Sequence, residues 1–369
     1  MKDRLTRVTL RGFKTINALT DFDPGSLMVM IGANGAGKSN FISFFRLLSW
    51  TLSGQFQLHV QESGPASALM HDGPSRTHEI EVALTIQTEN GENEYAYRLF
   101  YAAGDILIFA DERFRFTREG YPVRDWISLG AGHRESKLAE YAASDDRGAQ
   151  TAAVTAALLR KIVVYQFHNT SDTARVRGQW NKDDGRWLKE DGANLAPFLY
   201  RLKQQEPKYY RRIVETTQIV LPFFLDYELE PEFGRLLLSW RERGTDRVFT
   251  APQAADGMLR LMALIALLQQ PESDLPNVLI LDEPELGLHP SAINVVAGLL
   301  RSISEQVQVI VATQSVSFID RFDPEHIVVV DRDKRESTFR RLNREDLDNW
   351  LEEYSMSELW EKNVIGGRP

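Results

Sequence analysis

Gly32-Ala33-Asn34-Gly35-Ala36-Gly37-Lys38-Ser39 is the stretch that decides the fold of this chain. It matches the phosphate-binding loop pattern G-x-x-x-x-G-K-[ST] at every fixed position. Residues 26–31, before it, are apolar and typical of a buried strand, and residues 40–48, after it, carry apolar side chains at helical spacing. Strand, glycine loop and helix in this order predict an α/β fold of the P-loop NTPase class.

The loop pattern assigns a role to each group. Glycines let successive backbone N–H groups point at a phosphate, and the helix N-terminus adds partial positive charge. Lys38 is expected to reach the β- and γ-phosphates of ATP, and the Ser39 hydroxyl to ligate Mg²⁺. Asn34 either positions the attacking water or caps the loop. The residues expected to bind the nucleotide are Gly32, Asn34, Gly35, Ala36, Gly37, Lys38, Ser39 and Asn40.

The composition of the 369-residue chain limits the kinds of protein that it can be. Its content of 43% hydrophobic and 26% charged residues is ordinary for a soluble globular protein. No apolar run approaches the roughly 18 residues of a membrane helix, and no signal-peptide core is present. The chain has no cysteine, which excludes disulfides and cysteine-ligated zinc and suits a reducing compartment. We therefore expect a cytoplasmic protein without a membrane partner.

The formal net charge of −9 argues against a strongly basic nucleic-acid binder. Any contact with DNA would have to use local basic patches, although solvated surface is the favoured interpretation of each. The candidates form three groups: Arg4, Arg7, Arg11 and Lys14; Arg113, Arg115 and Arg118; Lys208, Arg211 and Arg212.

Hydrophobic periodicity predicts the remaining elements. Alternating segments that predict strands of an antiparallel sheet lie at 5–13, 78–88, 94–101, 106–110 and 114–117. Helices are predicted at 139–160, 194–205, 207–221, 255–268 and 291–304, and further strands at 162–167, 227–240, 247–249, 278–281, 307–312 and 327–330. The strand–helix–strand unit of residues 278–312 implies parallel pairing.

Two carboxylates follow the apolar run of residues 278–281, which makes this segment a Walker B element. Asp282, at the strand end, is expected to hold Mg²⁺ together with Ser39. Glu283 comes where the chain turns, and its carboxylate is the expected general base that polarises the attacking water. Most of the chain separates Lys38 from Asp282, so the spacing fits a P-loop domain with a large insertion.

These residues carry a family resemblance. The segment 281–290, L-D-E-P-E-L-G-L-H-P, looks like the Walker B motif and D-loop of ABC-type ATPase heads of the RecF, Rad50, SMC and OLD branch. The segment 254–260, A-A-D-G-M-L-R, resembles the ABC signature in the S-D-G-x-x-R form. Residues 309–315 occupy the place of the switch strand. The resemblance covers nearly the whole chain and points to short, stand-alone RecF-like ATPases of the AAA family.

The resemblance implies a two-lobed head with an antiparallel β subdomain and a helical lobe. Residues 1–369 would form one ATPase domain. Its parts would be a Walker A half with an inserted sheet (1–170), a helical insert lobe (171–255), and a half with the signature, Walker B, D-loop and switch (256–369). In this family two heads sandwich two ATP molecules, so Asp256, Gly257 and Met258 would meet the nucleotide of a homodimer partner.

The resemblance also implies a function. It predicts an ATP-hydrolysing dimeric switch in DNA maintenance or antiphage defence, which controls a separate effector such as a nuclease or toxin. Gln314 stands at the switch position and is expected to contact the γ-phosphate or water. Ala255 replaces the signature serine, so turnover is expected to be slow.

Two alternatives stay open. A non-catalytic or slowly hydrolysing ATP sensor is favoured by Ala255 and Gln314 and opposed by Glu283. A transporter nucleotide-binding subunit predicts a shorter Walker spacing and a full L-S-G-G-Q signature, and the sequence has neither.

Four further residues are candidates for a role in or near the site. Phe13 either stacks on adenine or, as the sequence favours, lies in the core. Gln166 is either a Q-loop residue that couples Mg²⁺ to the second lobe or, as the sequence favours, a structural glutamine. His168 fits no known metal-ligand spacing, and His289 belongs to the D-loop, near the expected dimer interface.

Overall fold

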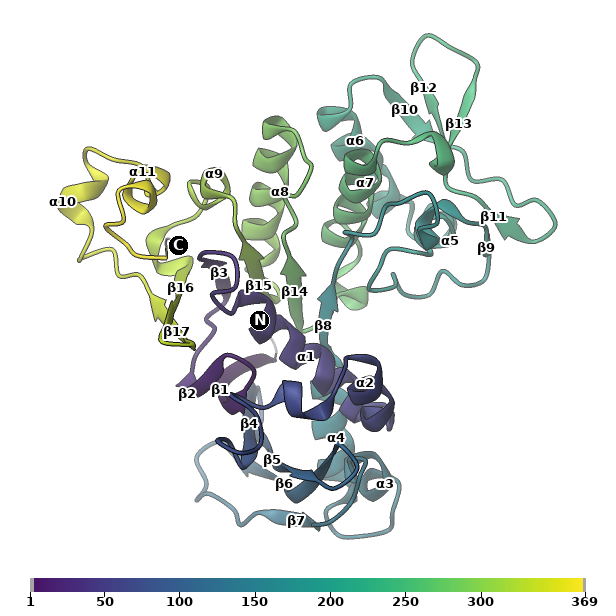
Figure 1. Cartoon of the computed structure of the whole chain (residues 1–369). Helices are drawn as coiled ribbons and strands as arrows, with labels where there is room; N and C mark the ends of the chain where they lie inside the picture. The colour runs from purple at the N-terminus through teal and green to yellow at the C-terminus, as the bar shows by residue number, and fades with distance from the viewer. Residues whose placement is uncertain (1–2, 368–369) are drawn as a thin grey trace. The chain divides into compact units, whose positions relative to one another are not determined.

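The structure is a computed structural model that describes residues 3–367, apart from the side chains of residues 348 and 349. The chain divides into two compact units. The first consists of Met1–Val163, Pro276–Ile280 and Val307–Pro369, and the second of Val164–Leu275 and Leu281–Gln306. Figure 1 labels the helices and strands of both units.

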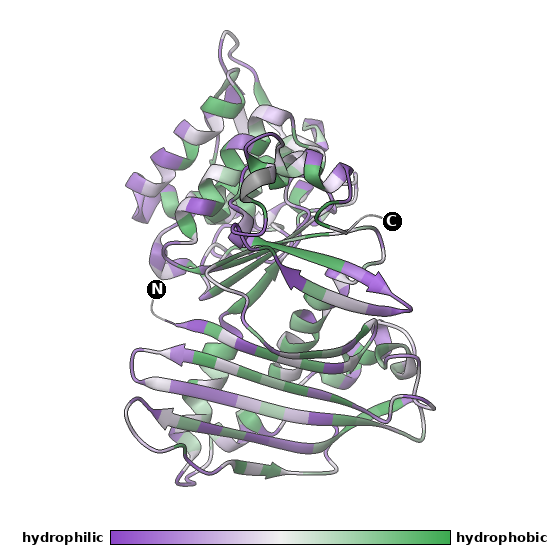
Figure 2. Cartoon of the chain, turned by 90° about the vertical axis from the view of Figure 1, so that its left-hand side faces the viewer, coloured by the Kyte–Doolittle hydropathy of each residue, from purple (hydrophilic) through white to green (hydrophobic). Residues whose placement is uncertain are grey.

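An antiparallel sheet of six strands forms one layer of the first unit, in the spatial order β2-β1-β4-β5-β6-β7. Its strands are β1 (Arg4–Phe13), β2 (Ile16–Phe22), β4 (Glu79–Thr88), β5 (Gly91–Ala102), β6 (Ile106–Arg118) and β7 (Ile127–Gly130). Figure 2 shows hydrophilic and hydrophobic residues alternating along these strands. The predicted antiparallel subdomain is thereby confirmed. The two strands predicted at 106–117 are one strand, because the pairing register shifts around Ala110 and interrupts the alternation.

A second six-stranded sheet has the order β17-β16-β3-β15-β14-β8. Its strands are β3 (Leu27–Ile31), β8 (Ile162–Tyr165), β14 (Val278–Asp282), β15 (Gln308–Thr313), β16 (Ile327–Asp333) and β17 (Glu336–Arg341). β3 pairs in parallel with both β15 and β16, and β17 adds an antiparallel edge. All five residues of β3 are buried, as expected of a strand covered on both faces.

Helix α1 (Lys38–Leu52) packs apolar side chains against both sheets of the first unit. The ring of Phe44 meets the ring of Phe13 on β1 edge to face at 6.2 Å. The ring of Phe41 lies 5.5 Å from that of Phe339 on β17. The other helices of this unit are α2 (Phe56–Glu62), α3 (Leu138–Ala142), α4 (Ala149–Arg160), α9 (Val316–Ile319), α10 (Asp348–Leu351) and α11 (Met356–Glu361).

The single helix predicted at 139–160 is wrong, since α3 and α4 are separate. The hydroxyl of Ser144 donates to the carbonyl of Tyr141 at 2.8 Å and accepts from the backbone N–H of Asp146 at 3.2 Å. Such local side-chain bonds compete with helical ones and end the helix.

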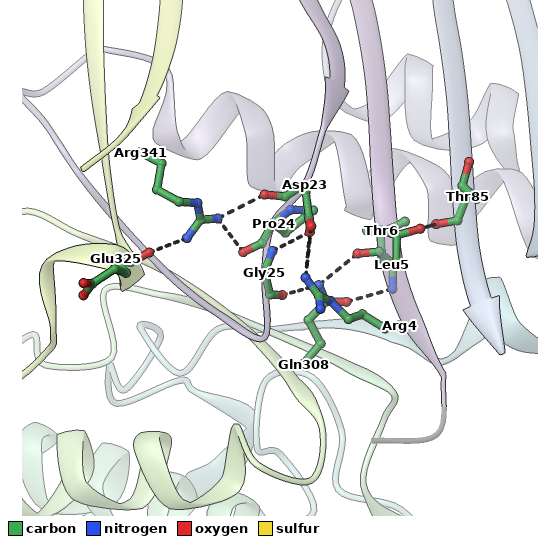
Figure 3. Close-up of polar contacts among 10 residues, drawn as sticks. All are labelled: Arg4, Leu5, Thr6, Asp23, Pro24, Gly25, Thr85, Gln308, Glu325 and Arg341. Atoms are coloured by element: carbon green, nitrogen blue, oxygen red, sulfur yellow. Dashed lines mark hydrogen bonds and ion pairs between the residues drawn. The ribbon is translucent and has the colours of Figure 1, made fainter. Parts of the chain in front are cut away.

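A polar cluster joins the two sheets of the first unit where β15 begins (Figure 3). The fully buried Gln308 accepts from the Leu5 N–H at 2.9 Å through its side-chain oxygen. Its side-chain nitrogen donates to the carbonyl of Leu5 at 2.9 Å and to that of Gly25 at 2.5 Å. One amide thus satisfies three backbone groups from β1 and from the turn before β3.

The second unit is a helical lobe with two small sheets. Its helices are α5 (Leu195–Gln205), α6 (Pro207–Val220), α7 (Asp256–Leu268) and α8 (Pro290–Ile303). α7 is buried along most of its length and packs against α5, α6 and α8. No helix within the described part of the chain is long and apolar enough to cross a bilayer.

The long strand predicted at 227–240 is wrong. Short strands stand there instead, with irregular backbone between them: β10 (Phe224–Tyr227), β11 (Arg235–Leu236) and β12 (Ser239–Glu242), with β13 (Val248–Thr250) and β9 (Trp180–Asn181) as partners. Pro231 lacks a backbone donor, and Phe233 and Gly234 have φ values of 49° and 78° that turn the chain. These residues interrupt the extended backbone.

Candidate functional site

The phosphate loop leaves β3 after Ile31 and ends where α1 begins, at Lys38. Gly35 and Gly37 have φ values of 77° and 124°, in the region that glycine adopts without strain. A Cβ atom at Gly32 would lie 2.1 Å from the carbonyl oxygen of Val330, and one at Gly37 would lie 2.0 Å from Oγ of Ser337. The loop therefore needs its glycines for close packing as well as for its backbone turn.

Lys38 is buried against the loop that precedes it. Its Nζ donates to the carbonyl oxygen of Gly32 at 2.5 Å and to that of Ala33 at 3.1 Å. These bonds keep a positive charge beside the loop backbone, which suits an ammonium group expected to meet phosphate oxygens.

A small hydroxyl network supports the loop from β17. Oγ of Ser337 lies 2.5 Å from the carbonyl oxygen of Ala36 and 2.6 Å from Oγ1 of Thr15. Asn40 donates its side-chain N–H to the same Thr15 oxygen at 2.7 Å. The side chain of Asn40, which the sequence assigned to nucleotide binding, therefore bonds to this network.

Gln314 follows β15 and lines the same cavity as the loop. The cavity, of about 80 Å³, is formed by Ala33, Asn34, Gly35, Gly37, Lys38, Ser39, Asn40 and Gln314. The structure thus brings the switch residue predicted from the sequence to the phosphate loop. Its part in hydrolysis stays a prediction.

Phe13 lies in the core, with 1% of its surface exposed and its ring against Phe44. It is therefore not placed to stack on a base, in line with the interpretation that the sequence favours. The neighbouring Lys14 donates to Oγ of Ser43 on α1 at 2.9 Å. Burial, followed by repulsion from Arg46, lowers the pKa of Lys14.

The Walker B carboxylates stand at the end of β14, in the second unit. Glu283 has a φ of 41°, in the left-handed region that costs a non-glycine residue about 1–2 kcal/mol. The turn ends the extended backbone of β14 at Glu283. The side chain of Glu283 therefore no longer follows the alternation of side-chain directions along the strand. Residues held in strained conformations cluster at functional sites.

Gln166 and His168 bond to Asp282 within the same unit. The Gln166 amide nitrogen lies 3.5 Å from the Asp282 carboxylate and 3.0 Å from Nδ1 of His168. Nε2 of His168 lies 2.8 Å from the Asp282 carbonyl oxygen. A carbonyl only accepts, so the proton sits on Nε2 and Nδ1 accepts from Gln166. A role of Gln166 as a Q-loop residue stays a prediction.

The signature segment opens α7, whose first residue is Asp256. The N-cap position is Ala255, which has no side-chain oxygen to cap the helix. A Cβ atom at Gly257 would lie 2.4 Å from the carbonyl oxygen of Gly287 in the D-loop, so this glycine allows close packing. The Met258 N–H donates to the carbonyl of Ala255 at 3.0 Å.

The D-loop and the signature helix bond to each other within the second unit. Arg260 of α7 donates through Nη1 to the carbonyl of Leu286 at 3.0 Å. His289 is the N-cap of α8, and its Nδ1 accepts from the backbone N–H of Ser291 at 3.3 Å. His289 therefore has a structural role at the start of α8.

Most of the arginines weighed as DNA patches are paired with carboxylates in the first unit. Arg4, Arg7 and Arg11 bond to Asp23, Glu92 and Glu81, and Arg113 and Arg115 bond to Asp111 and Glu94. These pairs reduce the positive potential of those two groups and favour their interpretation as solvated surface.

The sequence suggested residues 169–177 as a loop near the nucleotide or a partner, but it did not single out Thr15, Ser337 or the buried Arg177, whose guanidinium bonds to the signature segment. A serine in an edge strand and an arginine in a polar loop carry no local signal, because their partners come from distant parts of the sequence.

A family model described as "AAA domain, putative AbiEii toxin, Type IV TA system" matches residues 27–320. The chain belongs to this family. It is also 38% identical over 389 residues to the Old nuclease of Escherichia phage P2, in a match that covers 94% of the chain. The chain spans 62% of the length of that relative.

Solved structures show the same fold. An Smc head bound to the C-terminal winged-helix domain of ScpA superposes with a TM-score of 0.61, at 18% identity, over 93% of this chain and 99% of that chain. An Smc head with an extended coiled coil, derived from Pyrococcus furiosus, gives 0.58 at 18% identity over 95% and 99%. The chain therefore has the fold of an Smc head, and its family implies nucleotide binding.

Proposed function

We propose that the chain binds ATP with Mg²⁺, hydrolyses it slowly, and works as an ATP-driven homodimeric switch for a separate effector. The proposal is carried by one observation, a cavity that is lined by both the phosphate loop and Gln314. Family membership and the fold of Smc heads support the nucleotide-binding part.

The residues present fit a magnesium nucleotide. Gly32, Gly35 and Gly37 have the backbone freedom and close packing of a phosphate-binding loop. A hydroxyl from Ser39 and a carboxylate from Asp282 are hard oxygen ligands of the kind that Mg²⁺ prefers.

Each group then has a role in phosphoryl transfer to water. The bound Mg²⁺ would neutralise charge on the β- and γ-phosphates. Lys38 stabilises the same oxygens, Glu283 accepts the proton of the attacking water, and Gln314 orients that water or the γ-phosphate. Asn34 either positions the water or caps the loop.

The proposed dimer is supported by the resemblance of residues 254–260 to the ABC signature, which in that family meets the nucleotide of a second head. We propose that Asp256, Gly257 and Met258 serve the nucleotide of the partner chain, so that ATP joins two copies and hydrolysis releases them. Ala255 offers no hydroxyl to that phosphate. A lost hydrogen bond to a charged group costs about 1.5–3 kcal/mol, consistent with slow turnover.

The likeness to the phage Old nuclease supports a role in antiphage defence or DNA maintenance. We propose that the effector under its control is a nuclease or toxin supplied by a separate protein. We also propose contact with DNA, which either the effector or a local basic patch of this chain would make. A cytoplasmic location fits the cysteine-free composition.

A measurement of ATPase rate per chain against protein concentration, with and without DNA, tests the proposal. The rate should rise with concentration as dimers form. A rate that is independent of concentration would overturn the dimeric site.

The second candidate, an ATP sensor without useful turnover, is favoured by the missing hydroxyl of Ala255 and by the amide of Gln314, which is a poor proton acceptor. Gln314→Ala separates the two functions. A several-fold loss of turnover with ATP still bound supports the ATPase, whereas equal rates for variant and wild type contradict a catalytic role for Gln314.

A further inference from the structure

Arg177 is a buried arginine whose five N–H groups all find acceptors within the second unit. Nε donates to the carbonyl of Thr170 at 2.9 Å. Nη1 donates to the carbonyls of Ala251 and Ala254 at 2.6 and 3.1 Å. Nη2 donates to the carbonyl of Ala254 and to the carboxylate of Asp256 at 3.1 and 2.8 Å. Arg177 itself is 8% exposed.

Four of these bonds end on the segment that leads into α7. Ala254 receives two of them on one carbonyl oxygen, and Asp256, at the first helical position, is paired by charge. The intervening Ala255 has no side-chain cap to fix its own conformation. The planar guanidinium presents donors in a rigid fork, so it sets the positions of its acceptors relative to one another.

The same arginine is linked to the end of the Walker B strand. Oγ1 of Thr170 lies 3.4 Å from Nη2 of Arg260, which also donates to the carbonyl of His168 at 2.9 Å. The His168 ring reaches the carbonyl of Asp282 at 2.8 Å. A continuous path of polar contacts therefore runs from the signature segment to the backbone of Asp282, the residue expected to hold Mg²⁺, in the same chain.

We propose that Arg177 is a positioning residue that fixes the signature segment of one chain for the ATP bound by a second copy of the chain. The inference rests on the proposed dimeric ATPase. Arg177 also links two half-sites of the same chain through Thr170 and Arg260. One is the signature segment, which serves the partner's ATP, and the other is the Walker B segment, which serves the chain's own ATP. Arg177 touches neither nucleotide.

The proposal makes a prediction that a purely structural role does not make. A chain with Arg177 changed should keep a working phosphate loop and lose only the half-site that it offers to its partner. Lys38→Ala does the reverse, because it removes the phosphate contact and leaves the signature intact. A mixed dimer of the two variants therefore contains one complete site.

The experiment measures ATPase rates of full-length Arg177→Met, of Lys38→Ala and of their equimolar mixture. Each variant alone should lose about ten-fold or more of the wild-type rate. With random pairing and independent sites, the mixture should recover about a quarter of that rate. Arg177→Met alone should bind a fluorescent ATP analogue with wild-type affinity.

A mixture no more active than its components overturns the proposal, as does wild-type turnover of Arg177→Met alone. If Arg177→Met fails to fold, Arg177→Lys takes its place in the same mixing experiment. Lysine keeps the charge and the aliphatic stem, but its single nitrogen cannot span the same acceptors. The same results with Arg177→Lys would support or overturn the proposal. A wild-type rate independent of concentration would instead overturn the proposed function before any variant is compared.

Discussion

Oγ of Ser337 lies 2.5 Å from the carbonyl oxygen of Ala36, and this contact joins the edge strand β17 to the phosphate loop. Ser337→Ala removes the contact and leaves the loop sequence intact. We expect ATP affinity to fall about five-fold, because one hydrogen bond contributes roughly 1 kcal/mol. Titration with a fluorescent ATP analogue measures the change.

Thr338→Ala is the matched control, since Thr338 is the exposed neighbour of Ser337 on the same strand. It should bind ATP like wild type. Equal affinities for Ser337→Ala and Thr338→Ala would show that β17 does not set the geometry of the loop.

Glu283→Gln keeps the size of the side chain and removes its ability to accept a proton. Loss of a general base lowers the turnover rate by about 10²–10⁴-fold. ATP should then hold the two chains together, which light scattering after size-exclusion chromatography detects as a dimer. The exposed Glu305, also in the second unit, gives the control Glu305→Gln, which should hydrolyse normally. A Glu283→Gln chain that stays monomeric with ATP contradicts the assignment.

Gln308→Met retains the volume of the side chain but leaves the two buried backbone groups of Leu5 and the part-buried carbonyl of Gly25 without this partner. Unsatisfied buried groups cost about 1–3 kcal/mol each, and local relaxation recovers part of this cost. We expect the free energy of unfolding to fall by about 2–4 kcal/mol. Urea denaturation followed by fluorescence measures it. The control Gln306→Met, at an exposed position, should leave the free energy of unfolding nearly unchanged. Equal urea midpoints for the two variants would contradict a stabilising role for the Gln308 hydrogen bonds.

His59 gives a pH dependence of stability. Burial, followed by the positive charge of Lys14, lowers the pKa of His59 from its ordinary value of 6.5. The unfolded chain then binds the proton more readily, so the free energy of unfolding falls as pH drops below 6.5. His59→Gln should reduce the loss of stability between about pH 7 and pH 5. Melting temperatures across this range measure it.

His78→Gln, at an exposed position, is the control and should keep the wild-type slope. If His59→Gln also keeps that slope, the folded protein does not disfavour the protonated form of His59.

The elements around the site were predictable because their signals are local. Residues 27–31, directly before Gly32, are all apolar, as expected of a strand covered on both faces, and the structure places β3 there with every residue buried. The apolar spacing after Lys38 likewise predicted α1. The family resemblance predicted Gln314 as the switch residue, and the structure places it at the loop because it follows β15, which pairs with β3.

Predictions failed where short-range bonds or turns compete with periodicity. Ser144 ended a helix that its alanine-rich surroundings favoured, and Phe233 with Gly234 broke a strand that its apolar residues suggested. β2 was not predicted from the sequence at all, although it pairs with β1 along most of its length.

The sequence by itself determined the phosphate loop, the Walker B pair and the class of fold, because these depend on residue types at fixed local spacing. Only the tertiary structure decided that Ser337 supports Ala36, that Arg177 holds the signature segment and that Glu283 has a left-handed backbone. The two side-chain contacts join residues far apart in the chain. Their geometry exists only after the strands and helices have packed, so no local pattern could encode it.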